Sequence, residues 1–261
     1  MPDRNDILTE LGLTPVWRVR GFVVGGAPES DSGAPDTPQA GNVPTARGAD
    51  APSGADARLG RIAKIEWPDF APDVDACTTC GLCRGRRKSV PGVGDPHAEW
   101  LFIGEAPGAE EDARGEPFVG QAGKLLDNML AALGMKRGEN VYIANVLKCR
   151  PPNNRTPEPL EVEACRPYLD RQIALIKPKI IVALGKSAAT TLLDVDASIA
   201  SLRGRVHRYR GVPLVVTYHP AYLLRNLPDK AKAWEDLLFA RRTLRSADAP
   251  GDPPRSGNLN P

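Results

Sequence analysis

Short apolar runs alternate with segments of helical periodicity between residues 60 and 245. Four runs have the length and composition of buried strands: Trp100 to Ile103, Val141 to Ala144, Ile180 to Leu184 and Leu214 to Thr217. Four helices are expected between and after these strands, at about Leu125 to Leu133, Thr156 to Ile176, Ser187 to Leu193 and Lys230 to Leu244. The second of them is expected to have Thr156 as its N-cap and Pro157 in its first position. This alternation predicts a three-layer α/β fold, with a doubly wound, mainly parallel four-stranded sheet covered by helices on both faces.

Two stretches break this pattern. Residues 27–58 contain a single large aliphatic side chain, Val43, and residues 247–261 are similarly poor in apolar side chains. Neither buries enough apolar surface to offset the entropy lost on ordering. The expected organisation is a partner-binding or docking segment at 1–24, a disordered linker at 25–58, a folded domain at 60–245 and a disordered tail at 246–261.

Composition narrows the class of protein. The 34 basic and 32 acidic residues give a net charge of +2, but residues 71–245 carry +6, which is compatible with a polyanionic partner. No apolar run approaches the roughly 18 residues that a membrane span needs, and the N-terminus has no apolar signal region. We therefore expect a cytoplasmic protein without a membrane partner.

Polar residues follow each predicted strand. Glu105 comes after the first strand, Asn145 ends the second, and His219 follows the fourth. Open parallel sheets bind ligands outside the carboxyl ends of their strands, so a carboxylate, an amide and an imidazole are expected at one rim. The Gly-Lys-Ser sequence after the third strand lacks the upstream glycine of a phosphate-binding loop, which argues against a nucleoside triphosphate site.

The cysteines suggest a metal centre. Cys77 and Cys80 form a C-x2-C pair, and Cys149 and Cys165 follow at wide intervals. A zinc ribbon usually has a second close pair, whereas iron–sulfur clusters accept dispersed cysteines. The spacing favours a cluster but leaves zinc, or unrelated buried thiols, as alternatives. Cys83 extends the first pair to C-x2-C-x2-C and could compete as a ligand.

Taken together, the motifs resemble the family-four, iron–sulfur uracil-DNA glycosylases, here in a bacterial form with an N-terminal extension. The likeness covers about residues 75–245 in unbroken order. It rests on GEAPG with Glu105, the following Glu111-Asp112, PFVG with Phe118, IANVLKCRPP with Asn145, EACRP with Cys165, and HPAYLLRN with His219.

The resemblance implies a monofunctional glycosylase that flips deoxyuridine out of DNA and hydrolyses its N-glycosidic bond to start base excision repair. It implies a [4Fe-4S] cluster on Cys77, Cys80, Cys149 and Cys165, with Cys83 as a bystander. Phe118 would stack on the flipped base, and Asn145 would pair with uracil N3–H and O4 but not with cytosine. His219 would donate to O2, and Glu105 would stabilise the sugar cation or activate water.

Further site residues follow from the same resemblance. In the better-known uracil glycosylases, the catalytic aspartate and the thymine-blocking tyrosine align with Ala106 and Gly108, so both belong to the expected base pocket. Glu111 would crowd uracil C5 instead of that tyrosine. The segment expected to enter the minor groove and fill the vacated stack comprises Tyr222, Leu223, Leu224 and Arg225.

The N-terminal segment is amphipathic, with apolar residues from Ile7 to Leu13 and then Trp17. It is weakly similar to a clamp-loader-binding peptide of the bacterial replicase, so it would recruit the chain to the clamp loader or pack back on its own domain. The expected protein is a nucleoid-associated monomer acting on uracil-containing DNA. Two alternatives remain open, a non-catalytic iron–sulfur adaptor of the polymerase and a glycosylase with a broader range of bases.

Overall fold

The computed structural model describes residues 54–248. The segment 1–24, the linker up to residue 53 and the tail from residue 249 lie outside the described residues. Two boundaries differ from those expected. Helix α2 (Gly54–Ile62) begins within the stretch assigned to the linker, and helix α10 (Asp229–Asp248) continues into the stretch assigned to the tail.

A six-stranded sheet forms the centre of the described residues, in the order β1-β3-β2-β4-β6-β5. The four predicted strands are its parallel centre: β2 (Trp100–Gly104), β3 (Val141–Asn145), β4 (Ile180–Leu184) and β6 (Val212–Thr217). The mainly parallel sheet is confirmed, but the count of four strands was wrong. The strands β1 (Val93–Gly94) and β5 (His207–Tyr209) add antiparallel edges, and both are too short to show an alternating pattern.

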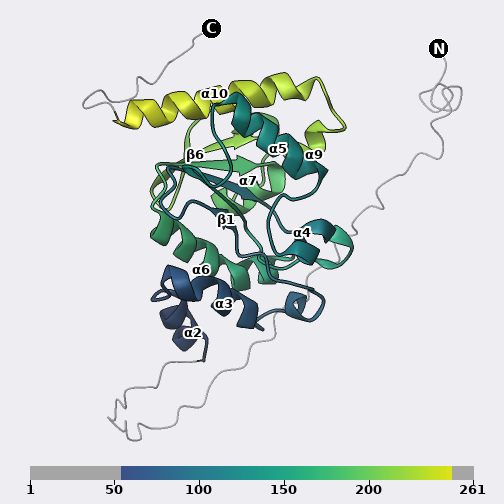
Figure 1. Ribbon diagram of the computed structural model, residues 1–261, viewed down its shortest axis with the longest axis vertical. Helices are drawn as coiled ribbons and strands as arrows, with labels where there is room; N and C mark the ends of the chain where they lie inside the picture. The colour runs from purple at the N-terminus through teal and green to yellow at the C-terminus, as the bar shows by residue number, and fades with distance from the viewer. Residues whose placement is uncertain (1–53, 249–261) are drawn as a thin grey trace, which may run out of the picture. The chain divides into compact units, whose positions relative to one another are not determined.

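Helices cover both faces of the sheet (Figure 1). The helices expected from periodicity are α5 (Gln121–Ala132), α6 (Pro159–Ile176), α7 (Lys186–Leu193) and α10. The structure adds the helices α3 (Trp67–Ala76), α4 (Ala109–Arg114), α8 (Ile199–Leu202) and α9 (Pro220–Leu223). It also adds two 3-10 turns, η1 (Gly81–Arg84) and η2 (Pro152–Asn154). Among the helices of residues 54–248, none has the length and apolar character needed to cross a membrane.

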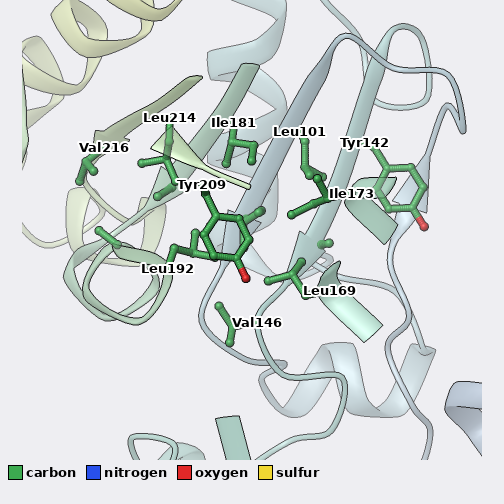
Figure 2. Close-up of a cluster of buried hydrophobic side chains, with 14 of the residues drawn as sticks. Leu101, Tyr142, Val146, Leu169, Ile173, Ile181, Leu192, Tyr209, Leu214 and Val216 are labelled. Carbon is green, nitrogen blue, oxygen red and sulfur yellow. The ribbon is translucent and has the colours of Figure 1, made fainter. Parts of the chain in front are cut away.

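Each face of the sheet has its own apolar core. On one face, Leu169 and Ile173 of α6 and Leu192 of α7 pack against the strands (Figure 2). On the other face, Leu126 of α5 and Leu237 of α10 do the same. All residues of β2, β3 and β4 are buried, and these strands are apolar runs except for the polar Asn145 at the end of β3, as expected of a parallel sheet covered on both faces.

Helix α6 begins two residues later than predicted. Its N-cap is Glu158, not Thr156, and Pro159 occupies the first position. A start at Thr156 would place Pro159 at N3, where it has no N–H to donate to the cap. The observed start places Glu161 at N3, where its side chain accepts from the Glu158 N–H at 2.9 Å and completes a capping box.

Replacing Glu161 with Ala should lower the free energy of unfolding by about 1–2 kcal/mol, because the cap is lost together with the ion pair to Arg155. Urea unfolding followed by far-UV circular dichroism measures this difference. Glu163→Ala, an exposed position on the same helix, is the matched control and should stay within about 0.5 kcal/mol of the parent. Equal effects of the two substitutions would contradict the capping role.

Candidate active site

The register of the parallel strands brings the predicted polar residues to one edge of the sheet. Gly104 pairs with Asn145, and Leu184 pairs with Thr217, so the residues that follow leave the sheet side by side. One pocket there is lined by Glu105, Ala106, Pro107, Gly108, Glu111, Phe118, Ala122, Asn145, Pro151, Asn154, Arg155, His219, Ala221 and Arg225. The structure thus brings together Glu105, Asn145 and His219, although 40 residues separate the first two and 74 the last two along the chain.

The amide of Asn145 lies at the inner end of this pocket. The residue is 2% exposed, and its Oδ1 has no hydrogen-bond partner among the described residues. A Cβ atom placed on Gly104 would lie 2.5 Å from this oxygen and 2.7 Å from the Phe118 ring, so only glycine fits beneath them. A buried acceptor without a donor is costly, on the order of 1–3 kcal/mol, and a ligand with an N–H group would remove that cost.

The Phe118 ring forms a wall of the same pocket. It is 6% exposed, and its centroid lies 5.5 Å from that of the His219 ring in a stacked arrangement. The backbone of Phe118 has a φ of 53°, in the left-handed region that bulky residues avoid. Such a conformation costs on the order of 1–3 kcal/mol and persists only where neighbouring contacts enforce it, most often at functional sites.

The position of His219 determines its protonation state. The backbone N–H of Ala221 donates to Nδ1 at 3.1 Å, so Nδ1 is unprotonated and the neutral ring carries its proton on Nε2. Burial, and next the charge of Arg225, lower the pKa of His219 from 6.5 to about 4. At neutral pH the residue is therefore an uncharged N–H donor.

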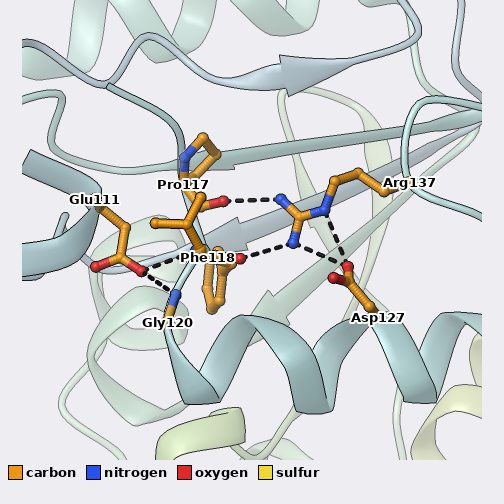
Figure 3. A network of polar contacts seen from close by, with 7 residues as sticks. Glu111, Pro117, Phe118, Gly120, Asp127 and Arg137 are labelled. Carbon is orange, nitrogen blue, oxygen red and sulfur yellow. Dashed lines mark hydrogen bonds and ion pairs between the residues drawn. The ribbon is translucent and has the colours of Figure 1, made fainter. Parts of the chain in front are cut away.

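The two carboxylates of the pocket differ in their surroundings. Burial raises the pKa of Glu105, and a hydrogen bond from Ser187 opposes this rise. Glu111 uses Oε1 to accept from the N–H groups of Val119 and Gly120, at 3.0 and 3.2 Å (Figure 3). Its other oxygen lies where a side chain on Gly108 would be. Glu111 is therefore engaged with the backbone of the Phe118 loop, whereas burial favours the protonated form of Glu105.

The segment expected to enter DNA is only partly at the surface. Arg225 lines the pocket and Leu224 is 43% exposed. Leu223, by contrast, is 1% exposed and packs in a core cluster, so it is not available as a wedge. Tyr222 stacks on Tyr218 and donates its hydroxyl to Asp229, which anchors the segment from below.

Some pocket residues were not predicted from the sequence. Pro151, Asn154 and Arg155 line it from the loop after β3, and Ala122 lines it from α5. Asn153 and Asn154 have φ values of 53° and 54°, a conformation that asparagine tolerates better than most residues. The Pro-Pro-Asn-Asn sequence directly after a strand was the available signal for this turn.

All five cysteines line a second cavity, between α3, η1, α6 and the end of β3. None is in a disulfide. Within residues 54–248, no three His, Cys, Asp or Glu side chains are placed to hold a single metal ion. An iron–sulfur cluster has its own sulfides and several irons, so its ligands do not converge on one ion, and a set of thiols around a cavity fits it. The structure places Cys83 here as well.

The cavity is surrounded by hydrogen-bond donors and positive charge. Arg86 donates to the sulfur of Cys149 at 3.0 Å, and the backbone N–H of Lys148 donates to the sulfur of Cys165 at 3.2 Å. The ammonium group of Lys148, whose residue is 1% exposed, donates to the carbonyl of Asn145 at 2.8 Å and to Gln172. Such donors stabilise thiolates and an anionic cluster, and they tie the cavity to the strand end that carries Asn145.

The domain is a mainly parallel α/β fold, and one pocket at its strand ends holds an amide, an imidazole and an aromatic ring. Such an arrangement is typical of an enzyme that binds a planar polar ring. The family model for the uracil DNA glycosylase superfamily matches residues 91–238, and the chain belongs to that superfamily.

Three relatives indicate which type of uracil-DNA glycosylase the chain resembles. The chain is 48% identical to the type-4 uracil-DNA glycosylase of Archaeoglobus fulgidus over 164 residues, which cover 60% of this chain and 82% of that protein. It is also 48% identical to the type-4 enzyme of Thermotoga maritima over 176 residues, 66% of this chain and 91% of the relative. The type-4 enzyme of Saccharolobus solfataricus is 42% identical over 208 residues, 73% of this chain and 96% of that protein.

The low pKa of His219 predicts a specific loss of stability in acid. The unfolded chain binds this proton near pH 6.5, whereas the folded protein binds it only near pH 4, so the contribution of His219 to stability falls as the pH drops between these values. His219→Asn, which keeps an acceptor for the Ala221 N–H, should flatten the dependence of unfolding free energy on pH in this window. Urea unfolding at several pH values tests this. An unchanged slope in His219→Asn would contradict the assignment.

Proposed function

We propose that this chain is a monofunctional uracil-DNA glycosylase that hydrolyses the N-glycosidic bond of deoxyuridine in DNA and so starts base excision repair. The family match and the type-4 relatives support this activity. The observation that carries the proposal is the buried, unpartnered Oδ1 of Asn145 in the pocket that also holds Phe118 and His219.

Recognition follows from the donors and acceptors of the base. Uracil offers N3–H as a donor and O4 as an acceptor, which match Oδ1 and Nδ2 of Asn145. Cytosine offers the opposite pattern and would leave the buried amide oxygen without a donor. Stacking of the flipped ring on Phe118 adds about 1–3 kcal/mol, which offsets part of the cost of removing the base from the helix.

Bond cleavage uses the other two groups. As the bond between C1′ and N1 breaks, its electron pair moves into the uracil ring and negative charge gathers on O2, where the Nε2–H of His219 donates a hydrogen bond. Because His219 is neutral, it stabilises this anion without transferring a proton. Water adds to C1′ on the sugar, and Glu105, with its raised pKa, orients the water and accepts its proton.

Other residues bind the DNA around the base. Glu111, beside Gly108, limits the space at uracil C5 and so disfavours thymine. Leu224 is exposed, and the adjacent Arg225 is exposed and lines the pocket, so an apolar wedge and a phosphate ligand stand next to each other, as a minor-groove contact requires. Tyr222 supports this segment from beneath through its contact with Asp229.

The thiol-lined cavity suits a [4Fe-4S] cluster held by Cys77, Cys80, Cys149 and Cys165. When bound, such a cluster supplies covalent cross-links between the α3–η1 segment, the β3 exit and α6. Arg86 and the Lys148 backbone donate to two of these sulfurs, and burial raises the pKa of the free Cys165 thiol to about 12. Cys165 is thus a poor thiolate until a cation binds it.

Removing the base-reading groups should abolish excision without unfolding the protein. Asn145→Ala and His219→Ala should each lower the single-turnover rate by roughly 100- to 1,000-fold, because each removes a hydrogen bond formed to the reacting base. The assay is alkaline strand cleavage of a uracil-containing oligonucleotide. Asn128→Ala and His97→Ala change the same residue types at exposed positions and should cleave normally. DNA binding with no base release by the parent protein would instead indicate a non-catalytic adaptor.

Purified protein should contain iron and acid-labile sulfide in equal amounts, with a broad visible absorption band. Cys165→Ser should lose both, because the cluster loses one of its four ligands. Cys83→Ser, in the same cavity, should retain both and is the matched control. Stoichiometric zinc without iron, or loss of iron in Cys83→Ser alone, would contradict this ligand set.

The remaining predictions concern the cellular setting. Recruitment to the clamp loader through residues 1–24 depends on a segment outside the described residues and stays a prediction. The cytoplasmic, nucleoid-associated location and the monomeric state also stay predictions. Assays on duplexes with G:T pairs and hypoxanthine distinguish a strict uracil enzyme from one with a broader range of bases.

A further inference from the structure

The ring of Phe118 is held by a clamp built from residues outside the pocket. Its backbone adopts a φ of 53°, which an isolated phenylalanine avoids. The guanidinium of Arg137, in the loop between α5 and β3, donates from Nη1 to the carbonyl of Pro117 and from Nη2 to the carbonyl of Phe118, both at 2.8 Å (Figure 3). Arg137 does not line the pocket, so its contact with the site passes through this backbone.

The geometry of these two bonds depends on the conformation of Phe118. In an extended chain, successive carbonyls point to opposite sides, so one planar guanidinium cannot bind both. At the observed φ of 53°, the Pro117 and Phe118 carbonyls each accept from one arm of Arg137 at 2.8 Å. Arg137 therefore stabilises this strained conformation over an extended one.

Three further contacts fix the same turn. Asp127 of α5 accepts from Nε of Arg137 at 3.0 Å and holds the guanidinium in place. Glu111 accepts from the next two N–H groups, those of Val119 and Gly120. Gly123 lies against the Phe118 carbonyl so closely that a Cβ atom would be 1.7 Å from the oxygen. Both sides of the strained residue are thus anchored.

We propose that Arg137, oriented by Asp127, is a positioning residue that holds the Phe118 ring ready to stack on the flipped uracil. This inference rests on the proposed function, and it adds a residue on a distant loop to the groups that determine the rate. Without the two carbonyl bonds, Phe118 relaxes towards negative φ and its ring leaves the position opposite Asn145 and His219.

The test compares Arg137→Gln with Arg171→Gln, because Arg171 also binds a backbone carbonyl and a carboxylate, those of Ile65 and Glu66, but away from the pocket. Arg137→Gln should lower the single-turnover rate roughly 10- to 100-fold, since small displacements of a positioning group have effects of this size. Affinity for undamaged DNA should change less than twofold. Arg171→Gln should keep the parent rate. Arg137→Lys, which can reach only one carbonyl, should be intermediate.

A double-mutant cycle separates positioning from a general structural effect. If Arg137 acts through the ring, Arg137→Gln should lower the rate less than about twofold in a Phe118→Leu background. Additive losses, or a parent-like rate in Arg137→Gln, would overturn the proposal. If Arg137→Gln does not fold, Arg137→Lys and Asp127→Asn are tested in the same cycle, and parent-like rates in both would overturn it. An inactive parent protein would refute the proposed function. An active parent protein with additive losses in the cycle would refute only the role of Arg137.

Discussion

The structure of the site depends on one constraint: the pairing of Gly104 with Asn145 at the end of two parallel strands. That register places the Asn145 amide against a glycine, beneath the Phe118 ring, with its oxygen buried and without a donor. Burying an unsatisfied acceptor opposes folding, so the rest of the domain must supply the stability that the site lacks. In the proposed function the same unsatisfied oxygen selects the base, because a ring with an N–H at that point relieves the cost and a ring with an acceptor there does not.

Phe118 and His219 are also held in states that cost free energy in the folded protein. Phe118 is kept at positive φ by Arg137 and Glu111, and His219 is kept neutral by burial and by the charge of Arg225. Each costs stability in the free protein, and each gives the group the form that the proposed reaction requires: a fixed stacking surface and an uncharged donor. The pocket is thus organised before DNA binds.

The base pocket and the thiol-lined cavity share a short stretch of chain. Asn145 ends β3 in the pocket, and Lys148 and Cys149 reach the cavity within four residues. The buried Lys148 ammonium donates back to the Asn145 carbonyl, while its own N–H donates to the sulfur of Cys165. A metal cluster in the cavity would therefore stabilise the backbone that carries the base-reading amide, although no cysteine touches the pocket.

The sequence alone determined the four central strands and the longer helices, because their apolar periodicity reflects burial on one or both faces. It also indicated Glu105, Asn145 and His219, since residues that follow parallel strands must meet at one edge. The tertiary structure decided the rest. Leu223 and Leu224 are adjacent and chemically alike, yet one is buried and the other exposed. Arg137 has no local signal, because its partners are backbone carbonyls about twenty residues away, and main-chain groups carry no side-chain pattern that a sequence could show.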